Sequence, residues 1–221
     1  MSRSGAPAAG SGRHVREVLL DGDGVLMSHR FGAPDGFLTA LADFVPDPVE
    51  AFAELSAAEL GFLRGEEGFL DALGSALRSR GSSATAVEVH AAVWQQIRVQ
   101  PEMSALVREL RGLGLGVHLA TNQEPTRAAY LKREAGYDDL LDSAYYSCDL
   151  GAAKPDAAFF TAVLEDLGAA PRETVFVDDN AANVAGALDV GLRAVQWAIP
   201  DGIDRLRTLL AGQGLPVGEP A

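Results

Sequence analysis

Short apolar runs alternate with helical repeats along most of the chain. The apolar runs occupy about 18–20, 117–120, 144–147, 175–177 and 194–199. Apolar positions three and four residues apart predict amphipathic helices between them, at about 102–112, 125–135, 156–167, 181–190 and 202–211. Continuous apolar runs of this length between helices indicate buried parallel strands. The pattern therefore predicts an α/β fold, with a doubly wound parallel sheet and right-handed crossovers.

The interval between the first two predicted strands has a different pattern. It shows only helical spacings, for example in the set Val89, Val93 and Ile97, and turns rich in Pro and Gly divide it. We therefore expect a small helical bundle, inserted as a cap domain after the first strand. The predicted division is a flexible N-terminal tail at 1–15, an α/β core at 16–29 and 101–212, a helical cap at 30–100, and a C-terminal tail at 213–221.

Polar side chains follow the predicted strands at their carboxyl ends. They are Asp21 and Asp23 after the first strand, Thr121 and Asn122 after the second, Lys154 in the loop after the third, and Asp178 and Asp179 after the fourth. Ligands of such sheets bind beyond the carboxyl ends of the strands, so we expect these side chains to meet. Clustered carboxylates repel one another without a cation, and hard oxygen ligands suit Mg²⁺. A lysine adds a second positive charge for a phosphoryl group.

The spacing of the first two aspartates suggests separate roles for them. Asp21 and Asp23 lie two residues apart where the first strand leaves the sheet. One carboxylate can attack a substrate while the other reaches the leaving group, and carboxylate nucleophiles form aspartyl-phosphates. Gly22 and Gly24 permit a tight exit of the backbone from the strand.

Composition excludes several classes of partner. The 221 residues include 31 acidic and 18 basic side chains, for a net charge of −13. This balance argues against a nucleic-acid-binding face and against a polybasic membrane anchor. The single cysteine, Cys148, excludes an intramolecular disulfide and a cysteine-cluster zinc site. Because no apolar run approaches the roughly 20 residues of a membrane span and the first residues lack a signal-peptide pattern, we expect a cytoplasmic location.

Lysine is scarce among the basic residues. Sixteen of them are arginine and only two are lysine, Lys132 and Lys154. Since the chain uses arginine at nearly every basic position, a lysine beside the predicted site suggests a need for a compact ammonium group.

Four segments together point to a known family. DGDGV at 21–25, ATN at 120–122, GAAKPD at 151–156 and VFVDDNAAN at 175–183 resemble, in the same order, the four motifs of the haloacid dehalogenase-like hydrolase superfamily. The resemblance implies a Rossmann-like core with an α-helical cap between the first two motifs. It also implies a role for each residue of the motifs.

These implied roles define the expected active site. Asp21 would be the nucleophile and a Mg²⁺ ligand, and Asp23 the general acid–base, with its backbone carbonyl on the metal. The remaining residues would bind the phosphoryl group or the metal: Thr121 and Asn122 hold phosphoryl oxygens, Lys154 neutralises charge, and Asp179, with Asp178 beside it, completes the metal site.

The resemblance implies a Mg²⁺-dependent phosphatase for a small phosphomonoester, acting through an aspartyl-phosphate. The residues of the last two motifs are most similar to those of sugar-phosphate phosphatases, including glucose-1-phosphate phosphatases. A phosphomutase similar to β-phosphoglucomutase would share all four motifs. A haloacid dehalogenase needs no acid two residues after its nucleophile, so Asp23 counts against it. A non-catalytic binding protein of this fold is a further alternative. The expected partner is a small phosphorylated metabolite, with oligomeric state left open.

Simpler interpretations exist for several of these residues. A calcium loop is excluded because Val25 and Gly32 occupy positions where such a loop needs oxygen ligands. Thr121-Asn122 and Asp178-Asp179 could instead cap the helices that follow them. Asn183 could brace the site or simply be exposed.

Other polar and aromatic residues fit no catalytic pattern. His118 and Trp94 are expected to pack in the interior, and neither His90 nor Cys148 has a partner pattern for catalysis. The residues that we expect to set specificity are His29, Arg30, Arg64, Gln95 and Gln96.

Overall fold

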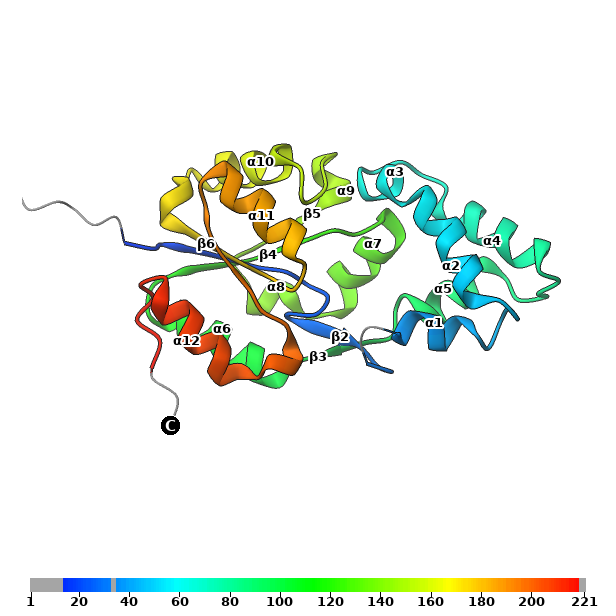
Figure 1. Cartoon of the computed structure of the whole chain (residues 1–221), viewed down its shortest axis with the longest axis horizontal. Helices are drawn as coiled ribbons and strands as arrows, with labels where there is room; N and C mark the ends of the chain where they lie inside the picture. The colour runs from blue at the N-terminus through cyan, green and yellow to red at the C-terminus, as the bar shows by residue number, and fades with distance from the viewer. Residues whose placement is uncertain (1–13, 33–34, 219–221) are drawn as a thin grey trace, which may run out of the picture.

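A computed structural model describes residues 14–32 and 35–218, and its centre is a five-stranded parallel sheet (Figure 1). The strands are β1 (Glu17–Leu20), β4 (Gly116–Thr121), β5 (Ser143–Tyr146), β6 (Thr174–Asp178) and β7 (Arg193–Gln196). Their order is β5-β4-β1-β6-β7, which confirms the doubly wound fold. The winding direction reverses at β1, so the loops after β1, β4 and β6 open onto one crevice.

Helices cover both faces of this sheet because alternate residues of each strand point to opposite sides. Val18 and Leu20 pack in one apolar cluster with α6 (Pro101–Gly112) and α12 (Ile203–Gly212). Leu19 packs in another cluster with α10 (Ala157–Leu167) and α11 (Ala181–Val190). Figure 1 shows the two pairs of helices on opposite sides of the sheet. Burial on both faces explains why the strands read as continuous apolar runs.

The five helices predicted for the core all form, each within one residue of its expected limits. Four of them are α6, α10, α11 and α12, described above. The remaining one is α7 (Pro125–Glu134), which begins at a proline as expected. One-turn helices were not predicted, because a single turn has no recognisable period. They are α8 (Tyr137–Leu140), α9 (Ser147–Leu150) and the 3₁₀ turns η1 (Pro171–Glu173) and η2 (Ile199–Asp201).

The segment between the first two motifs is a group of helices with an interior of its own. These are α1 (Gly36–Leu41), α2 (Pro48–Ala57), α3 (Glu59–Leu63), α4 (Phe69–Ser79) and α5 (Ala86–Val93). They share an apolar cluster, separate from those of the sheet, in which Leu41, Leu73 and Val89 are buried. Figure 1 shows this helical group to one side of the sheet. Its separate interior supports the proposed division of the chain into a core and a cap.

Two short strands connect the helical group to the sheet, and the sequence analysis missed them. β2 (Met27–His29) pairs antiparallel with β3 (Ile97–Val99). The expectation of helix throughout 30–100 was therefore wrong at its end, since α5 stops at Val93 and Ile97 lies in a strand. A three-residue strand forms because it pairs with a strand that is distant in the sequence. The local pattern of apolar residues carries no information about that pairing, so neither strand was predicted.

The structure describes only part of the two predicted tails. Residues 1–13 of the expected N-terminal tail lie outside the described residues. At the other end, Leu215 and Val217 are buried against the core, so residues 213–218 pack on the domain instead of forming a free tail. Burying these two apolar side chains stabilises the packed arrangement. In the part of the chain that the structure describes, no helix has the length and apolarity to cross a bilayer.

Candidate active site

Lys154 lies at the centre of a buried charged group beyond the ends of β1 and β6. Its Nζ atom lies 2.7 Å from Oδ1 of Asp21 and 2.7 Å from Oδ2 of Asp178. Lys154 is 4% exposed, Asp21 7% and Asp178 0%. Burial alone would lower the pKa of Lys154, but the two carboxylates raise it, so the ammonium group stays charged. The structure thus brings together three residues that the sequence analysis assigned to one site.

The carboxylates of this group outnumber the single ammonium. Asp21, Asp178 and Asp179 each offer one oxygen, and these oxygens lie within 4.8 Å of one another. Burial raises the pKa of Asp21 to about 7; the charge of Asp178 adds to this rise, and Lys154 opposes it. Burial and Asp178 also raise the pKa of Asp179. A set of hard oxygen donors with excess negative charge fits Mg²⁺.

The two adjacent aspartates have different surroundings. Asp178 accepts hydrogen bonds from Lys154, from the amide of Asn183 at 3.1 Å and from the backbone N–H of Asn180 at 2.8 Å. Asp179 is exposed at the rim of the site. The helix-capping alternative is wrong, because Asn180 caps α11 through the N–H of Ala182. Asn183 is buried, so of the two alternatives left open for it the structure favours bracing of the site over an exposed position.

Thr121 and Asn122 also lie at this edge of the sheet. The side-chain amide of Asn122 donates to the carbonyl of Lys154 and accepts from its N–H, both at 2.9 Å. These bonds hold the loop that presents the ammonium group. The hydroxyl oxygen of Thr121 accepts from Gln123 at 3.0 Å, which leaves its proton free to donate. Neither residue caps α7, because Glu124 does so.

Gly22 and Gly24 let the loop after β1 pass close to its neighbours. Gly24 has a φ of 81°, and a Cβ there would collide with the carboxylate of Asp179. A Cβ on Gly22 would lie 2.8 Å from Oγ1 of Thr121. Absence of a side chain at both positions therefore permits the tight exit that the sequence predicted.

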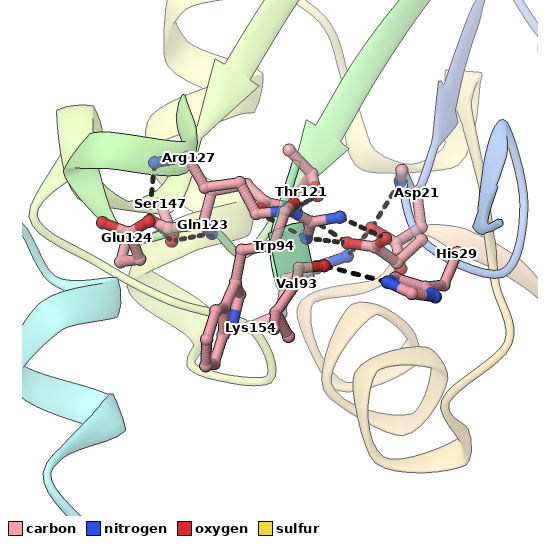
Figure 2. Close-up of polar contacts among 12 residues, drawn as sticks. Asp21, His29, Val93, Trp94, Thr121, Gln123, Glu124, Arg127, Ser147 and Lys154 are labelled. Carbon is pink, nitrogen blue, oxygen red and sulfur yellow. Dashed lines mark hydrogen bonds and ion pairs between the residues drawn. The ribbon is translucent and has the colours of Figure 1, made fainter. Parts of the chain in front are cut away.

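Arg127 is the site residue that the sequence analysis missed. Its guanidinium donates two hydrogen bonds to the carboxylate of Asp23, at 2.5 and 2.7 Å, and Gln123 donates a third at 3.0 Å. Arg127 also donates to the carbonyl of Trp94 at 2.7 Å; both residues are labelled in Figure 2. Arg127 is only 5% exposed. Burial alone would raise the pKa of Asp23, but Arg127 and Gln123 lower it below its usual value.

We expect Arg127→Lys to lower kcat by about 10²-fold, because a single ammonium cannot hold Asp23 through two parallel bonds and small misplacements cost this much. The measurement is the steady-state hydrolysis of an alkyl phosphate. Arg133→Lys is the matched control, since Arg133 is exposed on the same helix. A kcat within twofold of the parent protein would show that Arg127 does not orient Asp23.

Behind Arg127, the start of α7 is tied to the end of α5. Nε2 of His90 lies 2.8 Å from Oε1 of Glu124, and the ring of His90 stacks on Trp94. Glu124 in turn accepts from the backbone N–H of Arg127 at 2.6 Å. His90, for which the sequence offered no partner, therefore joins the helical group to the helix that presents Arg127.

Most of the predicted site residues line a cavity of about 460 Å³. Its lining includes Asp21, Asp23, Thr121, Asn122, Lys154 and Asp179. Of the five specificity candidates only His29 lines it. The others have partners elsewhere: Arg30 binds Gln96, Arg64 pairs with Asp156, and Gln95 contacts His90.

The residues expected to be non-catalytic lie as predicted. His118 is buried and contacts Glu17 at 3.0 Å, and Trp94 belongs to the apolar cluster of the helical group. Burial raises the pKa of the Cys148 thiol to about 11, so it is not a ready nucleophile at neutral pH.

Comparison with known proteins supports the family assignment. The sequence model of the haloacid dehalogenase-like hydrolases matches residues 15–191. A sesquiterpene phosphatase, astK, of Aspergillus oryzae is 38% identical over 97 residues, which cover 43% of this chain and 49% of that protein. Phosphatase MT3486 of Mycobacterium tuberculosis is 37% identical over 95 residues, covering 42% of this chain and 44% of that protein. The match thus spans less than half of each relative.

A solved structure has the same fold over nearly its whole length. It is an enzyme of the same family from Bacteroides thetaiotaomicron, bt-2542, in complex with magnesium and inorganic phosphate. The TM-score is 0.74 at 21% identity, covering 87% of this chain and 98% of that one.

Proposed function

The chain belongs to the haloacid dehalogenase-like hydrolase family, and on this basis we propose that it is a Mg²⁺-dependent phosphatase for a small phosphomonoester. One observation supports this most directly. The Asp21–Lys154–Asp178 group lies next to the exposed carboxylate of Asp179, with Asp23 two residues after Asp21. The two phosphatase relatives and the magnesium and phosphate of the bt-2542 complex favour the same function.

The metal site that we propose uses Asp21, Asp179 and the backbone carbonyl of Asp23. Asp178 is the outer partner, because Lys154, Asn180 and Asn183 already engage its oxygens. Bound Mg²⁺ would neutralise charge on the phosphoryl oxygens. Thr121 donates to one of these oxygens, and Lys154 supplies a second positive charge beside the nucleophile.

The reaction has two steps at phosphorus. A carboxylate oxygen of Asp21 attacks phosphorus, the P–O bond to the alcohol breaks, and Asp23 gives that oxygen its proton. Asp23 then takes a proton from a water molecule that attacks the aspartyl-phosphate and releases inorganic phosphate. Its pairing with Arg127 favours the ionised form required for this second step. The negative charge of an incoming phosphoryl group would favour the protonated form required for the first.

The first test is metal-dependent phosphate release. We expect hydrolysis of p-nitrophenyl phosphate in the presence of Mg²⁺, its fall to background with EDTA, and its recovery when excess Mg²⁺ is added. The physical reason is the surplus of carboxylates around one lysine, which would repel a phosphate dianion without a cation. Full turnover in metal-free buffer would rule out the proposed metal site.

Two rival activities are distinguished by their substrates and products. A dehalogenase would release halide from 2-chloropropionate, and halide release that survives Asp23→Asn would replace our proposal. A phosphomutase would isomerise a sugar phosphate faster than it releases phosphate. We expect no halide release, because two bonds from Arg127 hold the acid Asp23 in the site. A mutase would share Asp23, so the ratio of isomerisation to phosphate release decides between mutase and phosphatase.

A further inference from the structure

A second cavity adjoins the first on the side of the helical group. It measures about 180 Å³ and shares five lining residues with the larger cavity, Asp23 among them. In the proposed reaction the departing alcohol takes its proton from Asp23. Because Asp23 lines both cavities, the carbon skeleton of the alcohol has access to the second cavity.

The apolar half of the lining of the second cavity is mainly aromatic. The apolar lining comprises Phe37, Phe52, Phe62, Leu63, Phe69 and Trp94. The rings contact one another, with centroids 5.2 Å apart for Phe69 and Trp94 and 5.5 Å apart for Phe62 and Phe69. Apolar surface placed against these rings leaves water favourably, by about 25 cal/mol for each Å².

Most of the polar groups that border this cavity are already engaged, with Glu59 as the exception. Arg127 binds Asp23, Gln123 and the carbonyl of Trp94. Glu124 binds His90 and backbone N–H groups, and Asn122 binds the backbone of Lys154. Sugar hydroxyls that enter the cavity beyond the reach of Glu59 would lose water without gaining partners, at about 1–3 kcal/mol each.

Charge at the boundary excludes another class of substrate. Glu59 lines both cavities and is exposed. Its carboxylate would repel a second anionic group on the substrate, such as a carboxylate or another phosphate.

We propose that the leaving group is an uncharged hydrocarbon alcohol, whose apolar portion binds in the cavity lined by Phe52, Phe69 and Trp94. This inference rests on the proposed phosphatase function and replaces the sugar phosphate expected from the sequence. A dry cavity of about 150 Å³ accommodates benzene, so a space of about 180 Å³ holds a six-carbon ring and its methylene.

A matched pair of substrates tests the proposal. Cyclohexylmethyl phosphate and glucose 6-phosphate both present a six-membered ring and a primary alcohol leaving group, and they differ chiefly in hydroxyl groups. We expect kcat/KM to be about 10²-fold higher for cyclohexylmethyl phosphate, as two unpaired hydroxyls would cause. Equal values, or a preference for glucose 6-phosphate, would overturn the inference.

Acetyl phosphate separates this inference from the proposed function, because its leaving group is too small to use the second cavity. Turnover of acetyl phosphate together with a preference for the sugar would overturn the substrate class alone. No phosphate release from any of the three compounds would overturn the phosphatase function itself.

Phe52→Gln tests whether the second cavity is the source of the preference for cyclohexylmethyl phosphate over glucose 6-phosphate. We expect the ratio of the two kcat/KM values to fall about tenfold, because a polar group then lines the cavity. The ratio does not depend on the fraction of folded enzyme, so partial loss of stability does not obscure it. Phe44→Gln is the matched control: Phe44 packs on the same apolar cluster but lines neither cavity, so the ratio stays unchanged. An unchanged ratio in Phe52→Gln would contradict the assignment.

Discussion

Asp21→Asn is expected to abolish turnover, with kcat reduced by roughly 10⁴-fold or more, as for the loss of other catalytic nucleophiles. An amide has little nucleophilicity and is a weaker ligand for a cation than a carboxylate. The two side chains have the same shape, so the protein should still fold. Phosphate release and thermal unfolding followed by circular dichroism measure both effects. A variant within tenfold of the parent kcat would show that another group attacks phosphorus.

Asp23→Asn provides the contrast within the same loop. The amide leaves attack by Asp21 possible but removes proton transfer, which typically contributes 10²–10⁴-fold. We expect the loss to be large for an alkyl phosphate and much smaller for p-nitrophenyl phosphate, whose phenolate leaves without a proton. Equal losses on both substrates would mean that Asp23 is not the general acid.

Lys154→Arg is the second prediction with a large effect. The ammonium of Lys154 lies 2.7 Å from both Asp21 and Asp178 in a buried position. A guanidinium is planar and wider and favours two parallel bonds to one carboxylate. It would therefore displace the nucleophile or the metal, and we expect kcat to fall by about 10²–10³-fold, comparable to losing one electrostatic contact to a transition state.

Lys132→Arg is the matched control for this prediction. Lys132 pairs with Asp149 at 2.7 Å, and both side chains are exposed. Surface pairs of this kind contribute about 0–1 kcal/mol, so turnover and stability should stay near those of the parent protein. If Lys154→Arg is as active as Lys132→Arg at saturating Mg²⁺, Lys154 has no special role in the site.

The positions of the core aspartates and Lys154 could be predicted from the sequence because one physical rule places them. Buried parallel strands appear as short apolar runs, and their carboxyl ends share one edge of the sheet. Asp21 follows β1 and Asp178 is the last residue of the adjacent β6, so the pairing of these strands brings them together. Lys154 was identified by scarcity, since arginine occupies 16 of the 18 basic positions.

The contacts between distant segments were decided only by the tertiary structure. In the sequence, nothing distinguishes Arg127 from the other arginines on amphipathic helices. It binds Asp23 only because the first turn of α7 packs against the end of α5. The pairing of β2 with β3 is also remote in sequence, so β2 was not predicted and β3 was mistaken for part of the helical segment.

The tertiary structure also decides between a sugar and a hydrocarbon leaving group. Motifs around the phosphoryl site describe chemistry at phosphorus, which many substrates share. Helical spacing predicted amphipathic helices in this segment, and Phe37, Phe52 and Phe69 belong to or pack against their apolar cluster. A period of three or four residues gives the face of a helix but not its partner. Only the packing of five helices and the β2–β3 pair beside Asp23 leaves part of that aromatic surface lining a cavity next to the acid.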